Sequence, residues 1–413
     1  MTKEHTAMGK SIKWNSDSVY ALGLCRIMAG ALGIWPLIDD FFSRIRVFIV
    51  AFSQVYLNVS LIRALVMDCG AMNKLVDSVA LIACSSSVFL KIVTLRINQR
   101  RMFRIVSSAL EDWCVIQDAK SRKVMKSYAG AGRFVFILQI CTAYLGSIPR
   151  LIYSLPRTVP VSAIITNETV ANLTATGSVT IRGLPMGAAC TVANVSSQVY
   201  VAIYVLQIVQ FLVTASGNIG SDVYFFGVAM HVCAQFELLK TRFEDFGRDA
   251  VTENDKCVRD QLIVLVKRHN FLAGLSDDFE STFSIIILTQ LTVNAMHLSL
   301  LGIRLILGIR YGETVGIIYV CMAIYVLTLQ LYLYCYAGEY LSSLMEDLGD
   351  AAFKCCWYNL SPTIIKDLLF VVLRSQCPFY LTAGKFYAMN IENFKNIVKA
   401  IASYFSFLKL MID

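Results

Sequence analysis

Six long apolar runs constrain this chain more than any other feature of its sequence. Each run is close to the roughly 20 residues that a helix needs to cross the hydrocarbon of a bilayer. The runs cover residues 47–67, 75–95, 134–153, 199–216, 283–307 and 315–335. Hydrophobic residues make up 56% of the chain and charged residues 16%, which leaves too little polar surface for a soluble protein of 413 residues. The sequence therefore predicts an all-α protein that spans the lipid bilayer repeatedly.

A seventh, more polar run covers residues 391–411 and carries Lys395, Lys399 and Lys409. Because lysine is costly against lipid, protein or water is expected to shelter this helix. On a helical register its positions repeat at steps of four and three residues along one face. The residues of that face are Asn396, Ala400, Ser403, Phe407 and Leu410 or Met411. The face is polar or small over most of its length and bulky at its last turns, as in a wet vestibule closed by a hydrophobic constriction.

Residues 19–35 form another apolar run, but Arg26 interrupts it and Pro36 follows it. This pattern predicts an interfacial or half-inserted helix within residues 1–46. An additional spanning helix is the alternative, and it would reverse the orientation of every later helix.

The charges of the connections predict how the helices are oriented. The connection after the second run is rich in basic residues, which the positive-inside rule assigns to the cytoplasm. They are Arg96, Arg100, Arg101, Arg104, Lys120, Arg122, Lys123, Lys126 and Arg133. Residues 153–198 carry glycosylation sequons at Asn167, Asn172 and Asn194 and are expected to be extracellular, whereas a fourth sequon at Asn58 lies inside an apolar run. Seven spans then place the N-terminus in the cytoplasm and the C-terminus outside, opposite to a G-protein-coupled receptor.

Neither catalysis nor nucleic-acid binding is predicted. The four histidines are scattered, and the chain has no His-Glu-x-x-His motif and no paired Cys-x-x-Cys, so no cofactor or metal is expected. The net charge of +8 is not gathered in one patch, which argues against nucleic acid as a partner. Cys69 and Cys190 fall in predicted extracellular connections, and whether they pair stays open.

Amphipathic segments are expected to extend the spanning helices on their cytoplasmic side and to pack together there. Residues 97–117 carry an apolar stripe that includes Met102, Ile105 and Trp113, and residues 236–246 and 257–271 alternate charge with an apolar face. Residues 364–373 form a helix too short to cross a bilayer. This helix begins at Ser361-Pro362 and ends at Gln376-Cys377-Pro378, and Thr382-Ala383-Gly384 makes a second break before the last helix.

Five short segments near the C-terminus occur in an order that resembles the ending of insect odorant receptors. They are Tyr334-Cys335-Tyr336-Ala337-Gly338-Glu339, Trp357-Tyr358, Arg374-Ser375-Gln376-Cys377-Pro378, Thr382-Ala383-Gly384-Lys385-Phe386 and Ser403-Tyr404-Phe405. Each segment alone is a weak signal, but the ordered series is specific. The rest of the chain is similar to the family in pattern only.

The resemblance implies a single seven-helix domain over residues 1–413, in which residues 338–411 provide a cytoplasmic anchor and a pore helix. It implies a subunit of an odorant-gated cation channel in the plasma membrane of a sensory neuron dendrite. Matching to the family's ending places Phe407 and Met411 at the gate, and places Leu410 where the shared co-receptor has a polar residue. That departure leaves this subunit's contribution to ion selectivity open.

A small volatile ligand calls for a closed aromatic pocket with few polar groups. Family members bind odorants among the second, third, fourth and sixth helices, in the outer half of the membrane. The candidate contacts in this chain are Ile82, Ser85, Tyr144, Ile148, Tyr204, Gln207, Phe211, Tyr319, Met322 and Tyr325. For any one of them, ordinary packing between helices is the simpler explanation.

Within the family, a ligand-specific subunit is favoured over the co-receptor, because the co-receptor carries a long insertion between its fourth and fifth spans and this connection is compact. Such a subunit requires the co-receptor as a partner. A homomeric gustatory-type channel of the same superfamily is the alternative, although its usual Gln-Phe ending is missing here. A transporter is less favoured, since only the last helix is broken.

Overall fold

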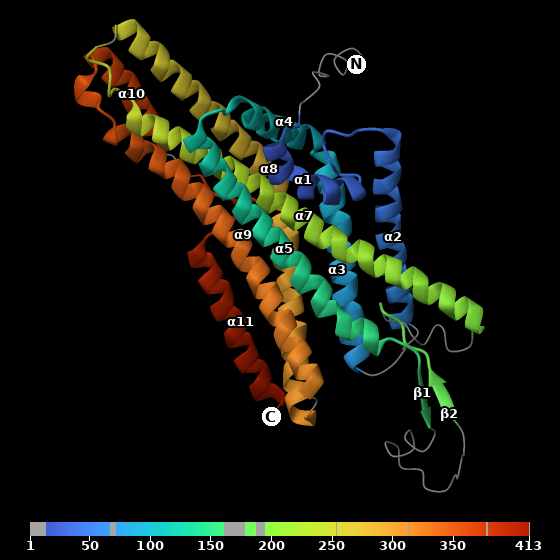
Figure 1. The fold of residues 1–413 in the computed structure, drawn as a ribbon. Helices are drawn as coiled ribbons and strands as arrows, with labels where there is room; N and C mark the ends of the chain where they lie inside the picture. Colours follow the sequence, from blue (N-terminus) through green and yellow to red (C-terminus); the bar gives the residue numbers. More distant parts are fainter. Residues whose placement is uncertain are drawn as a thin grey trace.

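Long helices dominate the fold (Figure 1). The computed structural model describes residues 14–66, 72–160, 178–186, 195–252, 254–312, 314–376 and 379–412. Within this part of the chain, six helices are long and apolar enough to cross a membrane, and each contains one of the predicted apolar runs. They belong to α2 (Phe41–Val66), α3 (Met72–Ile97), α5 (Ala119–Tyr153), α7 (Ser197–Asp245), α8 (Asp255–Tyr311) and α9 (Thr314–Lys354). The predicted all-α class is confirmed.

The seventh run forms α11 (Ile391–Ile412), which packs along α8 and α9 on the outside of the bundle (Figure 1). A small antiparallel hairpin of β3 (Thr382–Ala383) and β4 (Tyr387–Ala388) precedes it. Its turn requires positive φ at Gly384 (64°) and Lys385 (69°), and the amide of Gly384 donates to the carbonyl of Ser284 on α8 over 3.0 Å. The predicted break before the last helix is therefore a hairpin bound to α8.

The helix at the N-terminal end, α1 (Ser16–Ala31), packs against α5 and α7. Its 16 residues are fewer than a membrane-spanning helix needs. Asn15 caps it by accepting from the amide of Ser18 over 2.7 Å. Asp17 forms ion pairs with Arg122 and Lys126 of α5, and the hydrogen bond from Arg122 is the main cause that lowers the pKa of this carboxyl from its usual value.

The predicted amphipathic helix after α3 is α4 (Gln99–Val115), and its apolar stripe is buried. The two segments predicted between the fourth and fifth spans extend the spanning helices as expected, because they are continuous parts of α7 and α8. They reach the end of the bundle where α10 (Pro362–Ser375) packs on α9, at the upper left of Figure 1. A short 3-10 turn, η2 (Trp357–Asn359), leads into α10. Ser361 precedes α10 as predicted, but its hydroxyl bonds the Thr363 hydroxyl at 3.1 Å and not a backbone amide.

The core is centred on α7, which packs against α3, α5, α8 and α9. The buried ring of Phe225 on α7 lies with its centroid 4.7 to 5.1 Å from those of Phe279 and Phe283 on α8 and Tyr334 on α9. At the opposite end of the bundle from α10, β1 (Arg157–Pro160) pairs antiparallel with β2 (Ser178–Ile181) (Figure 1). The same end holds the C-terminal turns of α11.

Candidate functional site

Three of the predicted ligand contacts meet at the β1–β2 end of the bundle. Ile82 of α3 and Phe211 of α7 pack on a small apolar cluster of Leu57, Leu61 and Met186. The side-chain oxygen of Gln207, one helical turn before Phe211, accepts a hydrogen bond from the amide of Met186 over 2.9 Å. Here α2, α3 and α7 pack around an apolar cluster, and the side-chain oxygen of Gln207 binds the backbone of the loop segment that enters it.

Three further predicted contacts make their own polar bonds around this site. Ser85 is fully buried, and its hydroxyl donates to the backbone carbonyl of Gln54 over 3.2 Å. The hydroxyl of Tyr144 on α5 lies 2.8 Å from that of Ser216 on α7. The hydroxyl of Tyr204 lies 3.2 Å from that of Ser154, at the C-terminal end of α5. These buried hydroxyls are satisfied by protein groups, as buried polar groups generally are.

The remaining predicted contacts lie apart from that cluster. Ile148 on α5 is 44% exposed, and on α9 Met322 is 52% and Tyr325 is 56% exposed, so these side chains point away from the bundle of this single chain. Tyr319 is half-buried. The structure therefore brings together the contacts on α3 and α7 but places those on α9 at the periphery.

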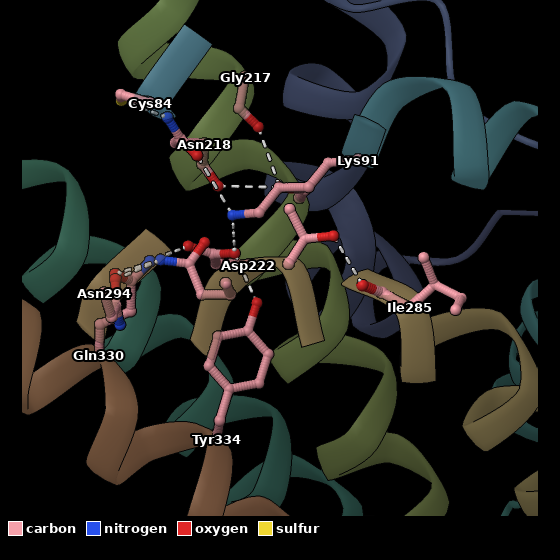
Figure 2. A network of polar contacts seen from close by, with 12 residues as sticks. Cys84, Lys91, Gly217, Asn218, Asp222, Ile285, Asn294, Gln330 and Tyr334 are labelled. Carbon is pink, nitrogen blue, oxygen red and sulfur yellow. Dashed lines mark hydrogen bonds and ion pairs between the residues drawn. The ribbon is translucent and has the colours of Figure 1, made fainter. Parts of the chain in front are cut away.

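A network of buried polar side chains lies deeper in the bundle (Figure 2). The ammonium of Lys91 on α3 is 2.7 Å from the carboxylate of Asp222 on α7 and 3.3 Å from the amide oxygen of Asn218. Lys91 is 0% and Asp222 2% exposed. An ion pair this deep in an apolar bundle is costly to desolvate, and it persists only when further hydrogen bonds satisfy both charges.

Helix α9 supplies those further bonds to Asp222. The hydroxyl of Tyr334 donates to one carboxylate oxygen over 2.5 Å, and the side-chain amide of Gln330 donates to the other (Figure 2). Gln330 in turn accepts from Gln290 of α8 over 3.0 Å, and Gln290 also donates to Asn294 over 2.7 Å. The network thus joins α3, α7, α8 and α9 in the interior of the bundle.

Sequence reasoning missed this network, although part of its signal was present. Lys91 lies inside a predicted apolar run, where a charged residue is a marker of function or of a buried partner. Its partner was missed because the fourth run was predicted to end at residue 216, whereas α7 continues well past Asp222.

The predicted pore face of α11 is exposed in the single chain. Phe407 is 57% exposed, and Asn396, Ala400 and Ser403 are exposed as well. The opposite face contacts the bundle, where the ring of Phe405 lies against Gly302 of α8. The side chains of Leu410 and Met411 lie outside the part of the chain that the structure describes, as do Asn167, Asn172, Asn194, Cys69 and Cys190.

Among the described residues, no group of His, Cys, Asp or Glu is arranged to hold a metal ion. The described site offers apolar surface and hydrogen-bonding groups, which is the chemistry of binding.

Comparison with known proteins places this chain. Residues 71–402 match the family model described as 7tm Odorant receptor. Odorant receptor 22c of Drosophila melanogaster is 27% identical over 201 residues, which cover 46% of this chain and 48% of that protein. Odorant receptor 10 of Aedes albopictus is 25% identical over 230 residues, which cover 55% of this chain and 60% of that protein. The chain spans about half the length of the curated relatives it matches.

The fold is also similar to a solved structure. The insect olfactory receptor OR5 from Machilis hrabei superimposes with a TM-score of 0.72 at 13% identity, covering 95% of this chain and 99% of that one. The structure of that receptor in complex with eugenol gives a TM-score of 0.73, also at 13% identity, and covers 96% and 100%. At this identity the likeness shows a shared seven-helix membrane fold. Because the family model matches well over half of its residues, this chain belongs to the 7tm odorant receptor family.

Proposed function

We propose that this chain is the odorant-binding subunit of a ligand-gated, non-selective cation channel, which it forms with an olfactory co-receptor as a heterotetramer. The channel lies in the plasma membrane of a sensory neuron dendrite. A small volatile binds in the outer half of the bundle and shifts a closed–open equilibrium at the pore helix.

The exposed face of α11 is the observation that carries this proposal. Asn396, Ala400 and Ser403 point away from their own bundle, and Phe407 follows on the same face. Polar residues of a membrane helix need water or another protein surface rather than lipid. Four such helices around an axis provide both, with a wet vestibule and a hydrophobic constriction near Phe407 and Met411 that gates by excluding water.

Exposed aromatic residues at the other end of the bundle support assembly through residues 338–390. Around η2 and α10, Trp357 is 44%, Tyr358 71% and Phe370 69% exposed. Patches of this kind on a protein mark interaction sites. A cytoplasmic anchor between subunits is the use proposed for them.

The ligand site is proposed around Ile82, Ser85, Gln207 and Phe211, with the aromatic Tyr144 and Tyr204 at its edges. The α5 and α9 side of the ligand site is proposed to include Ile148, Tyr319, Met322 and Tyr325. An adjoining helix or subunit is needed to cover those of them that are exposed. Eugenol, named as bound to the OR5 receptor, is a small aromatic volatile with one hydroxyl. The apolar cluster with its Gln207 acceptor suits a ligand of this type.

The test is whole-cell current in cells that express this chain with or without an insect olfactory co-receptor, challenged with a panel of volatiles. Odorant-evoked cation current that requires both subunits and persists when G-protein signalling is blocked is the expected result. Current from this chain alone would favour the homomeric, gustatory-type channel. An odorant response that disappears when G-protein signalling is blocked would contradict a channel.

A further inference from the structure

Residues 182–186 of the loop after α5 are folded into the bundle instead of lying on its surface. Leu184 is 7% and Met186 only 1% exposed, and Pro185 between them is buried. Connecting segments normally run over the surface, because buried backbone groups need hydrogen-bond partners. This segment has such partners. The hydroxyl of Tyr200 donates to the carbonyl of Gly183 over 2.9 Å, and the amide of Met186 donates to Gln207 over 2.9 Å.

The entry of this segment into the bundle is closely fitted. A Cβ on Gly183 would lie 2.5 Å from the carbonyl oxygen of Ser154, so only glycine allows the two backbones to approach. Arg182 fixes the outer end by donating to the carbonyl of Val195 over 2.5 Å and to the hydroxyl of Ser197 over 3.2 Å. The segment is thus held in place at Arg182 and Gly183, the residues that precede its buried part.

The side chain of Met186 fills the space between three helices. It packs with Leu57 and Leu61 of α2, and Leu81 and Ile82 of α3 and Phe211 of α7 pack on the same cluster. Ile82 and Phe211 belong to the proposed ligand site, and Gln207 binds the backbone of Met186 itself. Met186 therefore occupies the place that the proposed function gives to the odorant.

Methionine is suited to such a role. Its unbranched thioether side chain fits irregular apolar spaces and rearranges at low cost. When its backbone amide withdraws, the hydrogen bond from that amide to Gln207 breaks, and a ligand hydroxyl can donate to Gln207 in its place. The other members of the cluster are apolar: Leu57, Leu61, Leu81, Ile82 and Phe211.

We propose that Met186 is a tethered occupant of the ligand site that the odorant displaces, and that the favoured odorants are apolar molecules with one hydroxyl. The inference rests on the proposed odorant-binding function. Because a ligand binds only where Met186 has withdrawn, the apparent affinity of every ligand is lowered by the same factor, the fraction of receptors in that state.

The first test compares the wild-type chain and Met186→Ala, each expressed with the co-receptor, against the 1-alkanols from butanol to decanol. Met186→Ala removes the competing side chain, so every alcohol should become more potent by a similar factor. Burying a methionine side chain is worth at least about 1.5 kcal/mol, so half-maximal concentrations should fall roughly tenfold. Met186→Phe, with a larger apolar side chain to displace, should make every alcohol less potent.

Leu184→Ala is the matched control, because Leu184 is buried in the same segment but packs on Tyr200 instead of the Met186 cluster. It should leave the half-maximal concentrations unchanged. Unchanged half-maximal concentrations in Met186→Ala, with current of normal size, would overturn the proposal. So would an equal shift in Leu184→Ala.

A second measurement does not depend on current. The thiol introduced by Met186→Cys is labelled with a maleimide in open membrane sheets, and wild-type labelling of the 13 native cysteines is subtracted. Labelling should be slow without ligand and faster with 1-octanol. Fast labelling without ligand would show that the segment is not inserted, and slow labelling that octanol leaves unchanged would show that no displacement occurs. If odorants evoke no current at all, the proposed function fails, while the labelling still decides the position of the loop.

Discussion

At the scale of single residues, the Lys91–Asp222 pair is the most demanding feature of the molecule. Both charges are taken out of water, at a cost of several kcal/mol each, and their attraction alone does not reliably offset that cost. Additional bonds come from Asn218 on α7 and from Gln330 and Tyr334 on α9. Together with Lys91 on α3, the network of the pair joins three helices. The pair therefore fixes the position of α9 relative to α3 and α7 more than it adds net stability.

We expect Lys91→Met to destabilise the protein by about 3–5 kcal/mol, because it leaves the carboxylate of Asp222 buried without its countercharge. The double variant Lys91→Met, Asp222→Leu should lie closer to the wild type than Lys91→Met alone, since no buried charge remains. Thermal unfolding of the solubilised protein measures both. Lys395→Met is the control, as an exposed lysine whose loss should change little. Asp222→Leu alone completes the cycle, and if the losses from the two single variants simply add in the double variant, the two charges are not coupled.

At the scale of helices, α11 is held against the bundle by close packing. A Cβ on Gly302 of α8 would lie 2.4 Å from the ring of Phe405 on α11. Gly302→Ala should therefore push the pore helix outward, at a cost of about 1–3 kcal/mol from overpacking. The expected results are lower thermal stability and a changed ratio of basal to odorant-evoked current.

Adding Phe405→Leu to Gly302→Ala should restore both properties. Leucine is smaller than phenylalanine and has no ring, so the added methyl group then has space. Gly146→Ala provides the control, since a Cβ at that helical position would meet nothing within 4 Å. Equal effects of Gly302→Ala and Gly146→Ala would mean that the change acts through helix propensity and not through contact with α11.

The sequence predicted the helices well because each apolar run had the length of a membrane crossing, and because glycine and proline marked the breaks before α11. It also predicted that the amphipathic segments 236–246 and 257–271 extend the spanning helices. It did not predict that residues 217–235, which include Asp222, belong to the same helix, because the apolar run was taken to end at residue 216. The insertion of Met186 was also beyond prediction, since a loop has no periodicity and its burial depends on contacts with Ser154 and Gln207, which are distant in sequence.

At the scale of the whole molecule, orientation across the membrane remains a prediction from charge and sequons. We expect the wild-type protein to carry N-linked glycans that are lost when Asn167, Asn172 and Asn194 are all changed to Gln, because these sequons lie in the predicted extracellular loop. Electrophoretic mobility before and after glycosidase treatment measures this. Asn58→Gln should have no effect, since Asn58 lies within α2. The predicted orientation would be reversed if the wild-type protein carried no glycans but a variant with a sequon engineered into the α3–α4 connection did.

The gate is a property of the assembled channel. Phe407 is exposed in the single chain but would meet its counterparts around the pore axis. Phe407→Ala removes a large apolar side chain from a constriction that excludes water, so we expect the closed state to lose on the order of 1.5 kcal/mol and the current without odorant to rise roughly tenfold. Recording basal current with the co-receptor, at matched surface expression, measures this.

Val398→Ala is the control for that experiment, because it lies on the same helix nine residues away and so faces about half a turn from Phe407. It should leave the basal current unchanged. If Phe407→Ala also leaves it unchanged, the constriction is formed elsewhere, and the co-receptor's own pore helices would have to close the channel. If both variants raise it, the effect reflects loosened packing of α11. Only a rise confined to Phe407→Ala supports a gate at this position, and with it a pore to which this subunit contributes its own helix.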